Sequence, residues 1–172
     1  MRLKTANTWE HAGGRVEGRP VKALLQRVSQ ASVGIGGEVV GRIGPGLVVF
    51  LGVADDDAER DAHYLAEKTL NLRIFADSEG RFNLSVLDVL GELLVVSQFT
   101  LFADTKRGRR PGFTEAAEPA KAEALYEQFL SLLRSSGLKV DAGRFQEYML
   151  VEIHNDGPVT ILLDSRDKYP RP

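Results

Sequence analysis

The sequence predicts a single α/β domain in which a mixed, largely antiparallel sheet carries helices on one side. Short apolar segments separated by glycine and proline turns predict strands, and two longer segments have the periodicity of amphipathic helices. Their order is roughly β-β-β-α-β-β-α-β-β with hairpins at both ends, which excludes a purely parallel sheet. A length of 172 residues fits one domain, and 43% hydrophobic and 27% charged residues are typical of globular proteins.

The first three strands are clearly marked. Residues 22–35 are rich in β-formers, Gly36-Gly37 predicts a turn, and residues 38–43 complete a hairpin. Another turn at residues 44–46 precedes residues 47–53, a short apolar run with many β-branched side chains. Such a run predicts a strand buried on both faces.

Two helices each show a start signal and an apolar stripe. The first is predicted to open at residues 55–57, with Asp56 and Glu59 in a capping arrangement, and the second to begin at Pro119 and end before Gly137. The predicted stripes are Ala62, Leu65, Ala66, Thr69 and Leu70 in the first helix, and Ala122, Leu125, Phe129, Leu132 and Leu133 in the second.

The remaining strands are shorter. Residues 73–76 predict one strand, and residues 93–101 begin as another buried strand with polar residues near its C-terminal end. Two closing strands are predicted near residues 147–155 and 159–164, joined by a turn at residues 155–158, whose sequence is Asn-Asp-Gly-Pro.

Residues 1–20 differ from the rest. They show no apolar periodicity and no continuous apolar core of a signal peptide, so we expect a disordered or non-native extension before a domain at residues 21–172. We expect Val21 to be the true start. The chain has no cysteine, which excludes disulfides and thiol nucleophiles and fits a cytoplasmic protein.

Metal and cofactor chemistry has no support in the sequence. The histidines His11, His63 and His154 are far apart, and no Walker loop or dinucleotide fingerprint is present. The sequence therefore predicts no metal, no cofactor and, in the absence of a long apolar segment, no membrane contact.

Hydroxyl groups lie near the C-terminal end of the strand predicted at residues 93–101. Ser97 and Thr100 lie where α/β folds often place site residues, and His154 is the one obvious base inside the domain for a hydrolase. The same hydroxyls would equally serve to satisfy backbone groups at a strand end. Both interpretations stay open from the residues alone.

A cluster of positive charge lies in the basic loop, which we define as residues 104–113. Lys106, Arg107, Arg109 and Arg110 concentrate four charges in a chain whose net charge is −2. Such a cluster either forms a solvated surface loop or binds phosphate.

Several of these segments together resemble the D-aminoacyl-tRNA deacylase family. The resemblance rests on Ser97-Gln98-Phe99-Thr100-Leu101 followed by Asn155-Asp156-Gly157-Pro158-Val159-Thr160, with further similarity from residue 23 onward. The chain departs from the family pattern in its N-terminal extension, at Gly112 and at His154.

The resemblance implies a cytoplasmic homodimer that hydrolyses D-aminoacyl-tRNA, and probable substrates would include mischarged glycyl-tRNA. It assigns catalysis to Ser97, Gln98, Phe99 and Thr100. It further implies a cis Gly157-Pro158 bond that enters the partner's site and excludes L-substrates, with Arg27, Met149 and Asn155 supporting that motif. The basic loop would bind tRNA, whereas DNA would not be a partner.

Other functions remain as alternatives. One is a non-enzymatic RNA-binding module that uses the basic loop. The other is a general small-ester hydrolase that uses Ser97, Thr100 and His154. A nucleophilic role of Thr100 and a site that only positions water are both open.

Overall fold

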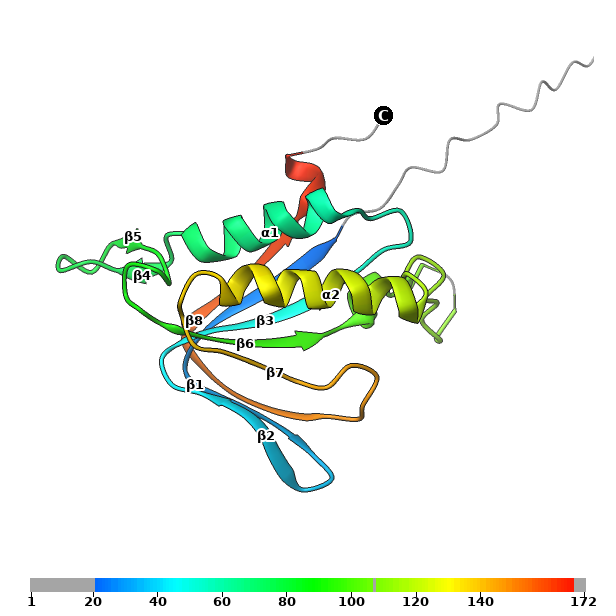
Figure 1. Cartoon of the computed structure of the whole chain (residues 1–172), viewed down its shortest axis with the longest axis horizontal. Helices are drawn as coiled ribbons and strands as arrows, with labels where there is room; N and C mark the ends of the chain where they lie inside the picture. The colour runs from blue at the N-terminus through cyan, green and yellow to red at the C-terminus, as the bar shows by residue number, and fades with distance from the viewer. Residues whose placement is uncertain (1–20, 107, 169–172) are drawn as a thin grey trace, which may run out of the picture.

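The structure, a computed structural model, describes residues 21–106 and 108–168, and the extension expected at residues 1–20 lies outside them (Figure 1). The elements follow the predicted order with two added short strands, and with one long strand in place of the two predicted closing strands. The strands are β1 (Lys22–Ile35), β2 (Glu38–Ile43), β3 (Gly46–Gly52), β4 (Phe75–Ala76), β5 (Phe82–Leu84), β6 (Glu92–Ser97), β7 (Val140–Ala142) and β8 (Leu150–Asp164). The helices are α1 (Glu59–Asn71) and α2 (Pro119–Arg134), with short 3₁₀ helices at Phe99–Phe102 and Ser165–Asp167.

One sheet organises the domain. Its order is β2-β1-β3-β6-β7, and β8 pairs with β1. The pairings of β1 with β2, β3 and β8 are antiparallel, whereas β3–β6 and β6–β7 are parallel. The predicted mixed sheet is confirmed, and the two parallel pairings place the C-terminal end of β6 beside that of β3.

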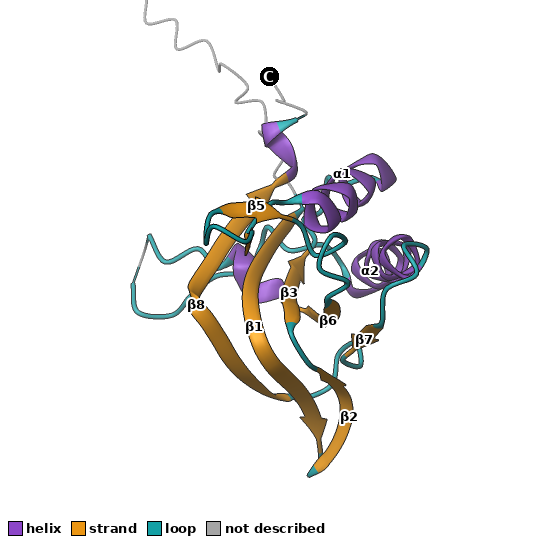
Figure 2. Ribbon diagram, turned by 90° about the vertical axis from the view of Figure 1, so that its left-hand side faces the viewer, coloured by secondary structure: helices purple, strands orange, loops and turns teal. Residues whose placement is uncertain are grey.

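Both helices cover the same face of the sheet and lie side by side (Figures 1 and 2). The main core lies between them and the sheet, and β3 contributes Leu47, Val49 and Leu51 to it. Val48 points to a second, smaller apolar cluster. The predicted burial of β3 on both faces is therefore confirmed, because its alternating side chains fill two different clusters.

The first helix starts later than predicted. It begins at Glu59, and the N–H of its N-cap residue Ala58 donates to the carboxylate of Asp61 at 3.0 Å. The predicted pairing of Asp56 with Glu59 is wrong. Asp57 instead closes the preceding turn, where its carboxylate accepts from the N–H of Ala54 at 2.5 Å, so the aspartates serve the turn before the helix.

The predicted C-terminal hairpin is also wrong. Residues 150–164 form one strand, β8, that pairs with β1 along its length. The turn sequence produces a local excursion instead: Asn155 pairs with Val28 and Thr160 with Gln26, so four residues stand opposite Arg27 alone. We call residues 156–159 the Gly-Pro loop. The short strands β5 and β7 were not predicted.

The side chain of Glu92, the first residue of β6, links that strand to the turn that precedes β3. The carboxylate of Glu92 accepts from the N–H of Gly44 at 2.9 Å and from Lys139 at 3.0 Å. The hydrogen bond from Gly44, and then the one from Lys139, lowers the pKa of Glu92. None of the helices in the described ranges is long and apolar enough to span a membrane.

Candidate functional site

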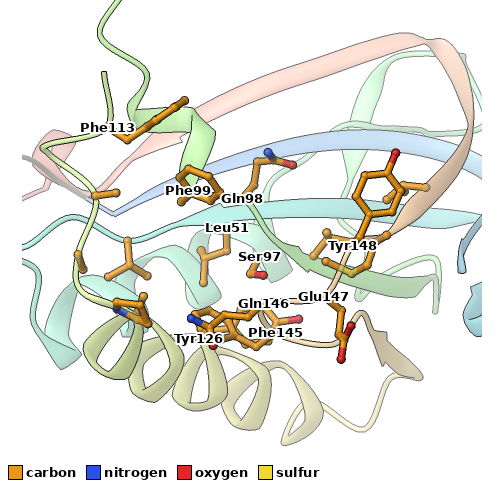
Figure 3. A pocket seen from close by; sticks show the side chains of 18 residues that line it. Leu51, Ser97, Gln98, Phe99, Phe113, Tyr126, Phe145, Gln146, Glu147 and Tyr148 are labelled. Carbon is orange, nitrogen blue, oxygen red and sulfur yellow. The ribbon is translucent and has the colours of Figure 1, made fainter. Parts of the chain in front are cut away.

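A cavity of about 820 Å³ opens beside the C-terminal end of β6. Phe99 and Phe113 lie at one end of it, Glu147 and Tyr148 lie at the other, and Ser97 lies between them (Figure 3). The cavity therefore unites segments that are far apart in the sequence, including one of the two motifs that carry the family resemblance.

Strand β6 leads directly into this site. It ends at Ser97, and the next residue, Gln98, donates its N–H to the carbonyl oxygen of Leu51 on β3 at 2.8 Å. The chain then turns into the 3₁₀ helix. Gly52 permits this close approach, because a Cβ at that position would lie 2.9 Å from the carbonyl oxygen of Gln98.

The four residues predicted to be catalytic divide into two groups. Ser97, Gln98 and Phe99 line the cavity. Thr100 is exposed and lies outside the lining, where its hydroxyl oxygen accepts a hydrogen bond from the side-chain amide of Gln98. The structure thus brings three of the four predicted residues to the cavity lining, and the fourth contacts one of them, Gln98, from outside the lining.

The backbone at the rim of the cavity offers hydrogen-bond donors. The first N–H groups of a helix have no acceptor within that helix. Those of Phe99 and Thr100 begin the 3₁₀ helix, and within residues 21–106 and 108–168 they donate to no acceptor. Such neighbouring N–H groups can stabilise negative charge that develops on an oxygen.

The basic loop is attached to this rim. Phe113 packs edge-on against Phe99, with ring centroids 5.0 Å apart. Asp104 and Gly112 exchange two backbone hydrogen bonds of 2.8 and 2.9 Å, which close the loop at its base. The loop is therefore held next to the cavity.

The predicted tRNA-binding side chains project from the loop. Lys106, Arg109 and Arg110 are exposed, and no acid in the described part of the chain forms an ion pair with them. Arg107 lies outside the described residues. The exposed charges are accessible to an anionic partner.

The opposite wall was missed by sequence reasoning. Residues 145–149 line the cavity as a loop, although a strand was predicted from residue 147. Gln146 has a φ of 62°, a left-handed conformation that is uncommon for residues other than glycine and that no sequence signal indicated. Gly143 leaves room for Met149 nearby, because a Cβ there would lie 2.5 Å from the Met149 sulfur and that side chain would have to shift.

Helix α2 contributes Tyr126 to the cavity wall. The Tyr126 hydroxyl donates to the carbonyl oxygen of Val95 on β6 at 3.0 Å. Burial raises the pKa of Tyr126, so this phenol stays neutral and keeps its proton near neutral pH. It is a fixed donor that ties α2 to β6 rather than a base.

The Gly-Pro loop lies outside the cavity lining. Its Gly157-Pro158 peptide bond is cis, as the family resemblance implied, and residues 156–158 are exposed. Asn155 braces the loop: its side-chain oxygen accepts from the N–H of Val159 at 2.8 Å, and its amide donates to the carbonyl oxygen of Val159 at 3.2 Å.

Arg27 reaches the same loop from β1. Its Nε donates to the carbonyl oxygen of Asp156 at 3.0 Å, and its Nη2 lies 3.1 Å from where a Cβ on Gly157 would stand. Arg27 and Asn155 therefore both contact the loop. Met149, the third predicted support, lines the cavity instead.

His154 does not meet the candidate serine. It is exposed on β8, its ring lies 3.4 Å from the amide of Gln30, and it is absent from the cavity lining. Ser97 and His154 therefore do not form the nucleophile–base pair of a serine hydrolase. Within residues 21–106 and 108–168, no three His, Asp or Glu side chains gather as they would to hold a metal ion.

Known proteins resemble this chain over nearly the whole described domain. A family model described as D-Tyr-tRNA(Tyr) deacylase matches residues 24–164. A D-aminoacyl-tRNA deacylase of Dehalococcoides mccartyi is 61% identical over 86% of this chain and 97% of the relative. One from Symbiobacterium thermophilum is 56% identical over 87% of this chain and 99% of the relative.

Two solved structures share the fold. The c-Myc DNA unwinding element binding protein has a TM-score of 0.78 and 43% identity, covering 83% of this chain and 97% of that one. A probable eukaryotic D-amino acid tRNA deacylase has a TM-score of 0.76 and covers 84% of this chain and 98% of that one. At 18% identity, the second likeness shows the fold alone.

Proposed function

The chain belongs to the D-Tyr-tRNA(Tyr) deacylase family and is a hydrolase of ester bonds, and from this premise we propose how it acts on its substrate. It hydrolyses D-aminoacyl-tRNA, and also mischarged glycyl-tRNA, to the free amino acid and tRNA in the cytoplasm. It rejects L-aminoacyl-tRNA through the Gly-Pro loop of a second copy. It thereby proofreads chirality in translation.

The unpaired N–H groups of Phe99 and Thr100 at the rim of the cavity carry the catalytic part of this proposal. Hydrolysis of the ester passes through a tetrahedral intermediate whose oxygen carries negative charge, and two fixed N–H donors stabilise that charge. An aminoacyl ester is already activated, so positioning the ester and a water molecule supplies much of the remaining acceleration.

The side chains support a positioning site over a covalent one. The Thr100 hydroxyl lies outside the cavity lining and accepts a hydrogen bond from Gln98. No histidine lies in the lining to activate Ser97. A serine or threonine nucleophile needs an adjacent base to accept its proton. A water molecule positioned beside the bound substrate is therefore the better supported nucleophile.

The homodimer is supported by the free edge of the sheet. Among residues 21–106 and 108–168, β8 pairs only with β1, and it exposes Leu150 by 68% and Leu162 by 54%. A long edge strand with exposed apolar side chains is a surface that proteins commonly cover. A second copy that covers β8 would also receive the exposed Gly-Pro loop.

Selection between D- and L-substrates then depends on the space available for the side chain of the substrate's amino acid. With the substrate ammonium held by the carbonyl oxygens of the Gly-Pro loop and the ester carbonyl held by the N–H groups of Phe99 and Thr100, only one direction remains open for the side chain. In the proposed arrangement an L-side chain meets the backbone of Gly157-Pro158 and a D-side chain points away from it. Exclusion of this kind needs no contact with the accepted side chain, so different D-amino acids and achiral glycine are all substrates.

The basic loop is the proposed contact surface for the tRNA. Phe113 fixes the loop next to Phe99, and the exposed charges of Lys106, Arg109 and Arg110 face solvent. Together with Arg107 they would contact the phosphates of the acceptor end, because contacts with phosphate supply most of the sequence-independent affinity for nucleic acids.

The test is the decay of matched D-Tyr-tRNA and L-Tyr-tRNA with catalytic amounts of the protein, with Gly-tRNA as a third substrate. We expect rapid loss of the D-ester and the glycyl ester while the L-ester persists at its spontaneous rate. Equal loss of D- and L-esters would indicate a general esterase and refute the exclusion mechanism. Binding of tRNA without any hydrolysis would indicate an RNA-binding module.

A further inference from the structure

The guanidinium of Arg27 is held on several sides at once. The Arg27 side chain is only 13% exposed. Its Nη1 donates to the carbonyl oxygen of Ile74 at 2.6 Å, while its Nε donates to that of Asp156 at 3.0 Å. The first contact comes from the segment that leads into β4 and the second from the Gly-Pro loop, so Arg27 links two parts of the chain.

The guanidinium of Arg27 also lies against an aromatic ring, that of Phe82. The Cζ of Arg27 lies 5.2 Å from the centroid of Phe82, which is within the range of a cation–π interaction. Phe82 is nevertheless 56% exposed, so its burial explains little of its presence at this position. The ring contributes mainly by holding the guanidinium.

The β4–β5 hairpin fixes that ring. Phe82 pairs with Ala76 across the hairpin. The carboxylate of Asp77 closes the turn, because it accepts from the N–H groups of Glu79 at 2.9 Å and Arg81 at 3.0 Å. The Asp77 side chain therefore holds the turn of the hairpin, and the hairpin and the residue before it bring Phe82 and the carbonyl of Ile74 to Arg27 together.

We propose that Phe82 is a positioning residue for the Gly-Pro loop and acts by pressing the Arg27 guanidinium against residues 156 and 157. The geometry is tight at this point, since Nη2 of Arg27 stands 3.1 Å from where a Cβ on Gly157 would lie. Without the ring, the guanidinium keeps its hydrogen bond to Ile74 but is held less firmly against the carbonyl of Asp156, so that contact weakens. Any effect on substrate selection rests on the function proposed above, whereas the effect on the loop does not.

The first measurement is hydrogen exchange at the amide of Val159, which donates to Asn155 within the loop. Phe82→Ala and Phe82→Leu both remove the ring, and Phe82→Leu keeps apolar bulk in case the alanine variant folds poorly. We expect Val159 to exchange about five-fold faster in both, from the strength of one cation–π contact. Phe82→Tyr keeps the ring and should exchange like the unmodified protein.

A matched control is Val39→Ala on β2, which removes another exposed apolar side chain, 48% exposed. It should leave exchange at Val159 unchanged. Unchanged exchange in Phe82→Ala and Phe82→Leu would overturn the proposal. A similar increase in the Val39 variant would also overturn it, since the loop would then respond to any surface change.

The second measurement is the ratio of kcat/KM for D-Tyr-tRNA to that for L-Tyr-tRNA. It should fall about five-fold in Phe82→Leu and recover in Phe82→Tyr. Faster exchange at Val159 in a protein that never hydrolyses D-Tyr-tRNA would support the positioning role while refuting the proposed function. An intact ratio with faster exchange would show that Phe82 positions the loop without setting selectivity, and would refute the link to the substrate.

Discussion

Removing the side chain of Asn155 tests what an ordered Gly-Pro loop contributes to turnover, because Asn155 holds the loop by hydrogen bonds to Val159. In Asn155→Ala the N–H of Val159 loses its acceptor at 2.8 Å, and Val159 is only 8% exposed. A buried donor left without a partner costs about 1–3 kcal/mol. The amide of Asn155 also loses its bonds to Val159 and Thr160, which are the weaker part because the Thr160 side chain is exposed.

The expected result is a loop that leaves its position for much of the time. If the loop must be ordered for turnover, about 1–3 kcal/mol corresponds to a fall of about 5- to 150-fold in kcat/KM for D-Tyr-tRNA. Deacylation should be measured together with urea unfolding, so that a change in loop order is separated from global loss of structure. The matched variant Thr160→Val removes one partner of the amide but leaves the Val159 acceptor in place, and its loss should be smaller.

Two results would refute this reasoning. Turnover of D-Tyr-tRNA by a folded Asn155→Ala within two-fold of the unmodified protein would show that an ordered loop is unnecessary. A larger loss in Thr160→Val than in Asn155→Ala would show that the buried N–H of Val159 is not the group that matters.

Four further changes test other parts of the structure. Gly157→Ala places a Cβ 2.7 Å from the Val159 side chain at a φ of 139°. The resulting strain of roughly 1–3 kcal/mol should lower D-Tyr-tRNA hydrolysis about 5- to 150-fold in single-turnover assays. Thr100→Ala should keep near-normal turnover, and complete inactivation would restore the nucleophile role. Combined Arg109→Ala and Arg110→Ala should lower the dependence of log Kd for tRNA on log salt by roughly 0.7–0.9 per charge without changing the D-to-L ratio. The pKa of Glu92 is lowered in the folded chain, so the contribution of Glu92 to stability is present above the ordinary glutamate pKa and is lost as pH falls through the folded value. The urea midpoints of the protein and of Glu92→Gln should therefore converge in acid. A gap between the midpoints that stays constant with pH would contradict the ion pair and the hydrogen bond.

The exposed edge of β8 is the contact surface of the proposed dimer. Residues 156–158 are exposed and lie outside the cavity of their own chain. Sedimentation of the protein and of Leu162→Glu would test the proposed dimer, since a charge on the proposed contact surface should shift the protein toward the monomer. A monomeric but fully D-selective variant would refute exclusion by a second copy.

Local patterns in the sequence determined much of the architecture. The hairpin of β1 and β2, the doubly buried strand β3 and the buried stripe of α1 followed from periodicity and turn residues, which act between near neighbours along the chain. The stripe of α2 was predicted in part, because Tyr126 and Leu130 are also buried there. The motif at residues 97–100 and the Gly157-Pro158 pair could also be found by inspection, and together they indicated the family. One failure was local as well: Asp56 was predicted to cap the first helix, whereas Ala58 is the N-cap residue and Asp57 closes the preceding turn, because both uses favour the same residue type.

Tertiary structure decided which of these residues meet. The bond of Arg27 to Asp156 joins positions 129 residues apart, and the long pairing of β8 with β1 converts the expected reverse turn into a loop within one strand. It also places residues 145–149 opposite Phe99 and separates His154 from Ser97. Periodicity and turn chemistry report only short-range preferences, whereas strand partners are selected by burial and hydrogen bonding over the whole domain. The sequence by itself therefore determined the elements and the motifs, and only the folded chain decided the composition of the site.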